Sequence, residues 1–448
     1  MTSAVTVGPE SRVAVVGYGL HGQAVAGALV RRGIAVTVVD DRPSDAATAH
    51  AQHLGLSVVT APDDQTLRGL LADASHLVPT PGLPEHHPAF VIAAELDLAV
   101  IGEFDLARRW DDRPCVAITG TNGKTTVTTM VTEMLVADGR QAVMSGNMEL
   151  PLVVAIDDPD TEIFVVEASS FRLGHSSTFA PTVATWLNFE PDHLDVHPSL
   201  ASYEAAKARI WANLGDDGVA IASATDETVR RNLPGRPNDR TFGGSDGDAL
   251  VVDGDIVVHG RRIAAVADLA RSLPHDVENA LAAALTAIEA GARDDAVADV
   301  LRSFAGLPHR VQLVGDADGI RWYNDSKATT PHAVLAGVGG FESVVLIAGG
   351  RNKGVDLSPL RALTPRLRGV VAIGDDAAEV EAVFADATAV VTADSMAAAV
   401  EAAAALAEPG DAVVLSPACT SYDWYPNYGA RGDDFARIVG ERIGAVAR

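Results

Sequence analysis

The sequence predicts an α/β protein of three domains: a Rossmann-like domain, a central domain of the P-loop type and a second Rossmann-like domain. At 448 residues the chain is longer than a single hydrophobic core usually organises. β-rich runs alternate with segments of helical periodicity throughout, and a glycine-rich loop follows such a run in each of the first two thirds. We expect the domains to comprise residues 1–111, 112–307 and 308–448.

The composition restricts the classes of partner. Hydrophobic residues make up 48% and charged residues 21%, as in a soluble globular protein. The formal net charge of −26 argues against a broad nucleic-acid surface or insertion at an anionic membrane, since both need clustered Lys and Arg. Small anionic ligands remain compatible with a locally basic cleft.

Targeting signals and cysteine frameworks are not expected. Cys115 and Cys419 lie far apart in sequence and form no disulfide or metal-binding pattern, which fits a reducing cytoplasm. The first ten residues lack a basic region followed by an apolar run, and the alanine-rich stretch near 396–407 is interrupted by Glu401. We therefore predict a cytoplasmic protein without a signal peptide or membrane span.

The first domain opens with a βαβ unit. Arg12–Val16 and Ile34–Val39 are β-rich, Gln23–Arg32 is helical, and the second β run ends at Asp40. The glycine motif between them, Gly17-Tyr18-Gly19-Leu20-His21-Gly22, lets backbone approach a diphosphate at a helix N-terminus. A UDP-type ligand, NAD and a tight turn without a ligand all remain open, and we favour the first.

The domain boundaries follow breaks in this pattern. Residues 108–114 are polar and end in proline, as a linker would, and the third βα region starts after Gly306-Leu307-Pro308. Between them, residues 235–262 predict small antiparallel strands. The other central elements are strands at 115–119, 163–166, 182–187 and 219–222 and helices near 124–135, 200–213 and 277–290. In the third domain we expect strands at 344–348, 369–373, 389–391 and 412–415, separated by alanine-rich helices.

The strongest local signal is the loop Thr119-Gly120-Thr121-Asn122-Gly123-Lys124-Thr125. It lies between a β run and an amphipathic helix, where backbone amides and an ammonium cradle phosphates and a hydroxyl holds Mg²⁺. The general P-loop pattern has glycine where this chain has Ile118. The loop predicts ATP as a substrate and a P-loop ATPase-type central domain.

Four further segments carry polar groups that suit phosphate chemistry. Glu167 ends a strand and could complete a Mg²⁺ shell with Thr125, although an exposed or helix-capping carboxylate is an equal alternative. On their residues alone, Asp192-His193-Leu194-Asp195 and Lys207 are more typical of a structural histidine and a solvated lysine. Arg310 and the segment 324–329, which contains Lys327, could bind phosphate or carboxylate, with charges exposed on loops as the alternative.

Taken together and in chain order, these motifs resemble the Mur ligase family over nearly the whole length. Members join an amino acid to a UDP-N-acetylmuramic acid precursor in bacterial cell-wall synthesis, through UDP-binding, ATPase and amino-acid-binding domains. The motifs that carry the resemblance are 119–125, 167–170, 192–193, Lys207, 309–310 and 324–329.

Within the family, 325–329 and 416–423 resemble the branch that adds D-glutamate, and the Asp-Asn-Pro-Arg pattern of the diaminopimelate- or lysine-adding branch does not occur. The resemblance implies UDP-N-acetylmuramoyl-L-alanine, ATP and D-glutamate as substrates, two Mg²⁺ ions, a carbamylated Lys207 and a monomer. Three alternatives remain: a related ligase for another amino acid such as L-glutamate, an inactive nucleotide-binding regulatory homologue, and a dehydrogenase. The last leaves the phosphate loop unexplained.

The resemblance also implies roles for individual residues. The catalytic residues would be Lys124, His193, Lys207 and Arg310. ATP would be bound by Gly120, Thr121, Asn122, Gly123, Lys124, Thr125, Thr126, Asp276, Asn279, Arg310, Asp325 and Lys327. The metal ligands would be Thr125, Glu167, His193 and Lys207. The UDP precursor would contact Gly17, Tyr18, Gly19, Leu20, His21, Asp40, Asp41, Arg42, Gly82, Asn147 and His193. D-Glutamate would contact Lys327, Thr329, Lys353, Ser421, Tyr422 and Tyr428. The chain departs from the family pattern at Glu149, where glycine is usual, at Asp276 and Thr330, where asparagine is usual, and at Tyr428, where phenylalanine is common.

Overall fold

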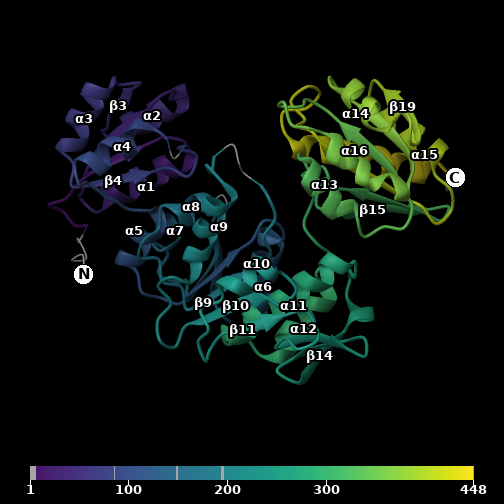
Figure 1. The fold of residues 1–448 in the computed structure, drawn as a ribbon, viewed down its shortest axis with the longest axis horizontal. Coiled ribbons are helices and arrows are strands. Elements are labelled where there is room, and N and C mark those ends of the chain that lie inside the picture. The colour runs from purple at the N-terminus through teal and green to yellow at the C-terminus, as the bar shows by residue number, and fades with distance from the viewer. Residues whose placement is uncertain (1–6, 85, 148–149, 193–195, 447–448) are drawn as a thin grey trace. The chain divides into compact units, whose positions relative to one another are not determined.

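The computed structural model describes residues 7–84, 86–147, 150–192 and 196–446, which form three β-sheets flanked by helices (Figure 1). The chain divides into two compact units. One unit comprises Met1–Ala270 with Val277–Ser303, and the other comprises Arg271–Asp276 with Phe304–Arg448. The first two sheets lie in the first unit and the third sheet lies in the second, so the α/β class expected from the sequence is confirmed.

The first sheet has five parallel strands in the order β3-β2-β1-β4-β5. Because β2 and β4 lie on opposite sides of β1, the carboxyl end of β1 is a topological switch point, where open α/β sheets bind ligands. The glycine motif starts there. The elements are β1 (Arg12–Val16), α1 (Leu20–Arg31), β2 (Ala35–Asp40), α2 (Asp45–His53), β3 (Val58–Thr60), α3 (Asp64–Ala72), β4 (His76–Pro79), α4 (Pro88–Glu95), β5 (Ala99–Val100) and α5 (Glu103–Trp110).

The sequence predicts a linker at residues 108–114, and the first half of that prediction is wrong. Residues 108–110 form the last turn of α5, because Phe104 and Leu106 extend the buried face of that helix into the core. Arg113 holds the second half of this segment in place. It forms an ion pair with Asp111 at 2.6 Å and donates a hydrogen bond to the carbonyl of Ile156 at 2.6 Å. The segment therefore joins the two sheets as an ordered connection.

The central sheet has nine strands in the order β14-β13-β12-β11-β10-β9-β6-β8-β7. The antiparallel strands expected within 235–262 are confirmed, and they extend the edge of this sheet. The helical stripe predicted after the phosphate loop is also confirmed, since Val127, Val131 and Leu135 are fully buried. The elements are β6 (Cys115–Thr119), α6 (Lys124–Ala137), β7 (Ala142–Gly146), α7 (Leu152–Ala155), β8 (Ile163–Glu167), α8 (Ser170–Gly174), β9 (Val183–Trp186), α9 (Leu200–Ala208), η1 (Arg209–Trp211), β10 (Val219–Ser223), α10 (Glu227–Asn232), β11 (Arg240–Phe242), β12 (Ala249–Val252), β13 (Asp255–Val258), β14 (Arg261–Ala265), η2 (Val266–Asp268), α11 (Pro274–Glu289) and α12 (Asp294–Ser303).

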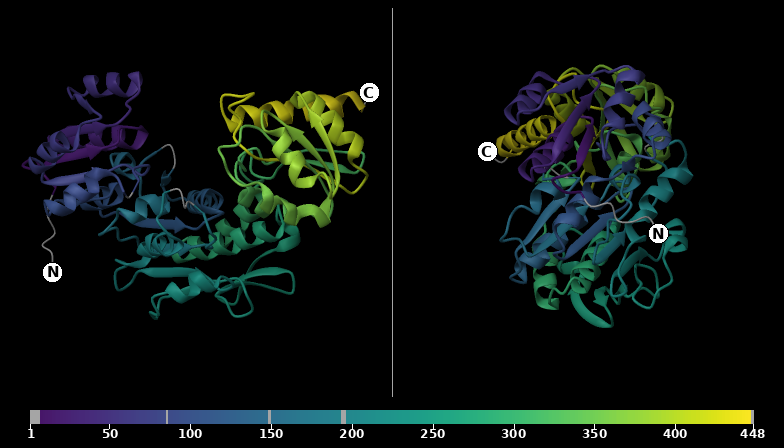
Figure 2. Two further views of the ribbon diagram at one scale, coloured as in Figure 1. Left: turned by 45° about the horizontal axis from the view of Figure 1, so that its top comes forward. Right: turned by 90° about the vertical axis from the view of Figure 1, so that its left-hand side faces the viewer.

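The third sheet has six strands in the order β15-β16-β20-β17-β18-β19, and only the pair β15–β16 is antiparallel. Alternate residues of β17 enter two different apolar clusters: Leu346 packs with α13 and α14, and Ile347 packs with α15 and α16. Helices therefore cover both faces, as Figure 2 shows. The elements are β15 (Gln312–Ala317), β16 (Ile320–Asn324), α13 (Pro331–Val338), β17 (Val344–Gly349), η3 (Ser358–Arg366), β18 (Leu367–Ile373), α14 (Ala377–Phe384), β19 (Ala389–Ala393), α15 (Met396–Leu406), β20 (Ala412–Ala418) and α16 (Tyr428–Val446).

The parallel order of the third sheet determines which loops meet. β16, β20 and β17 are adjacent and parallel, so the loops after Asn324, Ala418 and Gly349 leave the same edge. These loops carry most of the residues expected to bind the acceptor amino acid.

Two expectations concern single features of the chain. Over the residues that the structure describes, no helix has both the length and the apolar composition of a membrane span. Cys115 and Cys419 are both buried free thiols.

Candidate active site

The glycine motif of the first sheet forms a tight turn held by Asp40. Gly17 has a φ of 90°, and a Cβ there would lie 2.0 Å from Thr80 Oγ1, so glycine is required. The Asp40 carboxylate accepts backbone N–H groups from Tyr18 at 2.5 Å and from Arg42 at 2.8 Å. Asp40 thus joins the glycine loop to the turn after β2 at the switch point, which suits a diphosphate at the start of α1.

The other residues expected near the UDP moiety lie around this turn. Leu20 is 74% exposed, and Gly82 lies in the exposed turn after β4. Asp41 Oδ2 lies 3.3 Å from His87 Nε2.

His21 contacts the central sheet through Arg172, a residue that sequence reasoning missed. Arg172 on α8 is 3% exposed, forms an ion pair with Glu103 of α5, and has Nη2 at 2.9 Å from His21 Nε2. Burial, with the Arg172 charge, lowers the pKa of His21 to about 4. His21 is therefore neutral and accepts from Arg172, which couples the glycine motif to the central domain.

The phosphate loop lies between β6 and α6, as expected. Lys124 Nζ donates to the carbonyls of Gly120 and Thr121 at 2.9 Å each, so its side chain curls over the loop. A Cβ on Gly123 would lie 2.5 Å from Asn279 Oδ1, which puts Asn279 of α11 directly against the loop. The first turn of α6 then presents backbone N–H groups and an ammonium to one point, the arrangement that binds phosphate.

Asn188, which follows β9, is a second residue that sequence reasoning missed. Its Oδ1 accepts the backbone N–H groups of Thr121 at 2.9 Å and Asn122 at 2.8 Å, and its Nδ2 donates to the Asn122 carbonyl at 3.3 Å. Because β9 pairs with β6, Asn188 leaves the sheet beside the loop. Its position directly after a β-rich run was the available signal.

Lys207 is buried, contrary to the default expectation of a solvated helical lysine. It is 1% exposed on α9, with Nζ 2.6 Å from the Gly120 carbonyl and 4.6 Å from the centroid of the Tyr203 ring. Burial, together with the charge of Lys124, lowers the pKa of Lys207 well below its ordinary value. Two lysines thus converge on one carbonyl of the phosphate loop.

Glu167 lies at the same edge of the central sheet. It ends β8 in register with Ile118 of β6 and is 3% exposed. Its Oε1 accepts from Asn147 Nδ2 at 3.2 Å, while its Oε2 is buried without a hydrogen-bond partner among the described residues. A buried carboxylate oxygen of this kind fits a cation ligand.

The structure describes only some of the other residues that are expected to bind the metal. Thr125 is buried at the start of α6, but His193 lies outside the described residues, as does the departure at Glu149. Within the described ranges no group of three or more His, Cys, Asp or Glu side chains is arranged to hold a metal. The expected set is of a different kind, because it combines Thr125 and Lys207 with Glu167 and His193.

In the second unit, Arg310 sits on a strained turn. Its neighbours His309 and Val311 have φ of 61° and 44°, in the left-handed region that such residues rarely adopt. Arg271 Nη1 donates to the carbonyls of Arg310 and Val311 at 2.9 Å each and its Nη2 pairs with Asp276 at 3.1 Å. Asp276, expected to hold the nucleotide, is thus engaged in supporting this turn.

Asp325 follows β16 and is buried. Its carboxylate accepts from Ser416 Oγ at 2.7 Å and from the Val311 N–H at 3.2 Å. Burial raises its pKa to about 7, although Arg310 and Arg271 oppose the shift. Asp325 therefore links the strained turn to the β16 and β20 loops.

The acceptor residues cluster at the edge shared by β16, β20 and β17. Lys327 Nζ lies 5.3 Å from the centroid of the Tyr428 ring, and Lys353 Nζ lies 5.5 Å from that of Tyr422. Thr329 is in the same loop as Lys327, and Ser421 is buried next to Tyr422. Two ammonium groups on aromatic faces suit a ligand with two carboxylates.

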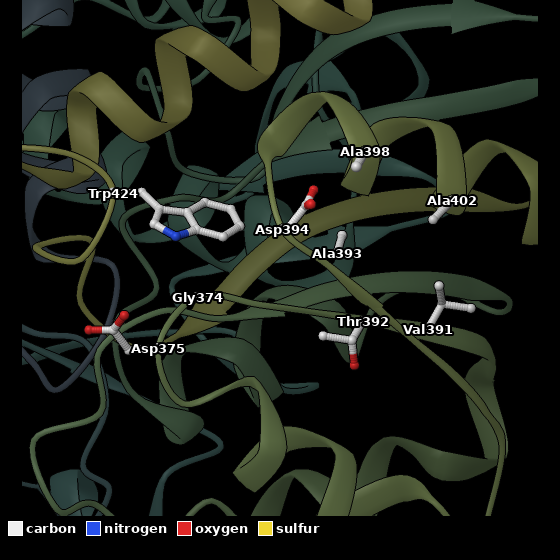
Figure 3. A pocket seen from close by; sticks show the side chains of 9 residues that line it. All are labelled: Gly374, Asp375, Val391, Thr392, Ala393, Asp394, Ala398, Ala402 and Trp424. Atoms are coloured by element: carbon white, nitrogen blue, oxygen red, sulfur yellow. The ribbon is translucent and has the colours of Figure 1, made fainter.

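A pocket of about 650 Å³ lies farther along this sheet, at the carboxyl ends of β18 and β19. Figure 3 shows Asp375, Asp394 and the indole of Trp424 around it. Asp375 already pairs with Arg351 at 2.9 Å. Its acidic lining opposes a dicarboxylate ligand, so we do not assign the acceptor site there.

Family models match three successive parts of the chain. The family model described as Mur ligase MurD-like, N-terminal domain, matches residues 11–102. The model for the Mur ligase middle domain matches 118–287, and that for the Mur ligase glutamate ligase domain matches 309–419.

Several relatives match over nearly their full length. A protein of Frankia casuarinae named UDP-N-acetylmuramoylalanine–D-glutamate ligase is 43% identical, covering 96% of this chain and 94% of that protein. The protein of the same name from Thermobifida fusca is 40% identical, with 96% and 98% covered.

Solved structures share the fold at low sequence identity. A pseudomurein peptide ligase type C from Methanothermus fervidus has a TM-score of 0.59 at 17% identity, covering 97% of this chain and 100% of that one. MurF from Acinetobacter baumannii also has a TM-score of 0.59 at 17% identity, covering 96% and 93%.

Proposed function

Since this chain belongs to the Mur ligase family, we propose that it joins D-glutamate to UDP-N-acetylmuramoyl-L-alanine while ATP is converted to ADP and phosphate. The names of relatives at 43% and 40% identity support this choice of substrates. The observation that carries it is the pair of lysines on aromatic rings, Lys327 on Tyr428 and Lys353 on Tyr422, at the acceptor edge of the third sheet.

The proposed reaction has two steps. An oxygen of the alanyl carboxylate attacks the γ-phosphorus of ATP, the bond to the bridging oxygen breaks, and ADP leaves. The product is an acyl phosphate. The D-glutamate amine then attacks its carbonyl carbon, a tetrahedral intermediate forms, the bond to the phosphate oxygen breaks, and phosphate leaves as the amide forms and the amine loses a proton.

The residues of the chain bind and orient the reacting groups. Lys124 and the N–H groups at the start of α6 would hold the ATP phosphates, and Asn188 keeps the loop in shape. Arg310 would stabilise charge on the transferring phosphoryl group, and hydrogen bonds from Arg271 hold the backbone turn that carries it. Lys327 and Lys353 would hold the two carboxylates of D-glutamate.

Mg²⁺ belongs to the same proposal. Glu167 Oε2, which has no hydrogen-bond partner within the described ranges, the Thr125 hydroxyl and a carbamate on Lys207 are oxygen donors of the kind that Mg²⁺ prefers. When bound, the ions would neutralise phosphate charge.

A carbamate on Lys207 also fits the structure. Burial lowers the pKa of Lys207, which favours the neutral amine that reaction with CO₂ requires, and the product would be an anion. With His193 added, the set expected from the sequence is complete.

The proposal also includes three further expectations from the sequence. They are the UDP moiety on the glycine motif with Asp40, Asp41 and Arg42, the three-domain division at 111 and 307, and a monomeric enzyme.

The test is an assay of ADP release with UDP-N-acetylmuramoyl-L-alanine, ATP and D-glutamate. We expect release that depends on all three, and loss of at least about 10³-fold in turnover for Lys124→Met, which removes the ammonium at the phosphates. L-Glutamate and diaminopimelate serve as parallel acceptors. Release without D-glutamate dependence, or preference for another acceptor, would overturn the proposal.

A further inference from the structure

Arg431 is a buried arginine on α16 that the sequence did not mark for any role. It is 1% exposed. Its Nε donates to Ser326 Oγ at 2.9 Å and its Nη2 to the Ser326 carbonyl at 2.9 Å. Its Nη1 and Nη2 donate to the Cys419 carbonyl at 3.1 and 3.2 Å. All of these partners are distant in sequence from Arg431 and lie in loops of the acceptor edge.

The guanidinium donates hydrogen bonds to two of the three loops that carry the expected acceptor residues, and it lies close to the third. Ser326 directly precedes Lys327 in the loop after β16, and Cys419 is two residues before Ser421 in the loop after β20. The loop after β17, which carries Lys353, contacts it through close packing.

Only glycine at position 350 allows this close approach. A Cβ on Gly350 would lie 3.2 Å from Arg431 Nη1 and 2.2 Å from the Thr420 carbonyl oxygen. One planar group therefore sets the spacing of all three loops.

Ser326 continues the network to the aromatic side of the site. Its hydroxyl accepts from Arg431 and donates to the carbonyl of Tyr428 at 2.8 Å. Tyr428 is the first residue of α16, and its ring lies against Lys327. The position of the aromatic ring under Lys327 thus depends on the same contact.

The charge of Arg431 is not neutralised by its hydrogen-bond partners. These partners are one hydroxyl and two carbonyl oxygens, and over the part of the chain that the structure describes no carboxylate forms an ion pair with it. Burial lowers its pKa to about 10, with Asp423 acting in the opposite direction, so the group is a cation at neutral pH. The contribution of Arg431 to this region therefore lies in the hydrogen bonds that it donates to Ser326 and Cys419.

We propose that Arg431 is the positioning residue of the acceptor site, holding three loops so that Lys327, Lys353 and Tyr428 face one dicarboxylate amino acid. The inference rests on the proposed function, because it takes D-glutamate as the ligand at this edge.

The experiment measures KM for D-glutamate, ATP and the UDP precursor in the full chain with Arg431→Lys and Arg431→Met. Lysine keeps the charge but lacks the planar fork, so we expect KM for D-glutamate to rise about tenfold. Methionine loses both features, and we expect a rise of about a hundredfold. KM for ATP and for the precursor should stay within about twofold in both variants.

A matched control separates positioning from simple destabilisation. Phe435 lies one turn farther along α16 and packs in the apolar cluster with Val439. Phe435→Leu should lower the midpoint of thermal unfolding without changing KM for D-glutamate. If Phe435→Leu reproduces the Arg431 result, or if all three KM values rise together, Arg431 has only a structural role.

Two results distinguish this inference from the proposed function. A wild-type chain that shows no D-glutamate-dependent ADP release removes the proposed function and this inference with it. An active wild type whose Arg431 variants keep the wild-type KM for D-glutamate removes this inference alone. Should the methionine variant fail to unfold cooperatively, Arg431→Lys and Ser326→Ala decide the question, each with an expected rise of about tenfold.

Discussion

The phosphate loop takes its shape from one short stretch of chain, whereas the acceptor region takes its shape from three loops that are far apart in sequence. In the phosphate loop, Lys124 donates hydrogen bonds to the carbonyls of Gly120 and Thr121. Asn188, which follows the neighbouring strand β9, accepts a hydrogen bond from the Thr121 N–H. In the second, Arg431 joins Ser326 and Cys419, which are 105 and 12 positions away.

The comparison teaches that the two binding steps depend on different kinds of structure. A local motif depends mainly on its own backbone angles and helix start, so a distant side chain alters it only where, like Asn188, that side chain bonds the loop directly. A region held by one buried cation loses its geometry when that cation or its immediate neighbours change. Substitutions in the two regions should therefore alter different kinetic parameters.

The largest expected effect comes from Gly350→Ala. Gly350 has a φ of 132°, and a Cβ would overlap the Thr420 carbonyl oxygen at 2.2 Å, so the loop must move. We expect a loss of about 3 kcal/mol or more in the free energy of unfolding, together with a large rise in KM for D-glutamate. Denaturant unfolding and steady-state kinetics measure the two effects.

Gly354→Ala is the matched control in the same loop. Gly354 also has a positive φ, 79°, but a Cβ there would meet no atom within 4 Å. Only the backbone cost of about 1–2 kcal/mol remains. Equal losses in the two variants would show that the close approach at Gly350 does not matter.

Asn188→Ala is expected to have an intermediate effect on the other region. Two backbone N–H groups of the phosphate loop lose their shared acceptor, so KM for ATP should rise about tenfold to a hundredfold. KM for D-glutamate should not change. Asn213→Ala, which removes a donor to the Ser177 carbonyl, is the control. A rise in both KM values would break the separation between the regions.

The smallest expected effect is the pH dependence contributed by Asp325. Its pKa in the folded chain is raised from 3.8 to about 7 by burial, so between these values the folded state holds a proton that the unfolded state has lost. This group therefore makes stability fall as pH rises through that window. Asp325→Asn should flatten the fall between about pH 5.5 and 7.5, by a few °C in thermal midpoint. Parallel curves for the two proteins would contradict the assignment.

Particular residues show how far the sequence could be interpreted. The sequence correctly predicted the strand Arg12–Val16, the strand that begins at Val344 and the buried helical stripe from Val127 to Leu135. These predictions succeed because strand and helix periodicities are local. Residues 108–110 were misplaced in a linker, since their polar composition concealed that they continue α5. Arg172 and Arg431 were missed because nothing near them in sequence distinguishes them from ordinary polar residues, and Asn188 was missed although it directly follows a β-rich run.

By itself, the sequence determined the α/β class, the phosphate loop and the positions where strands end in polar loops. These features depend on residue spacing over a few turns or strands. Only the tertiary structure decided that Lys207 is buried 87 positions from its partner Gly120, and that Arg431 lies between three loops. The reason is the order of strands: β6 lies between β8 and β9, and β20 lies between β16 and β17, which local periodicity does not encode.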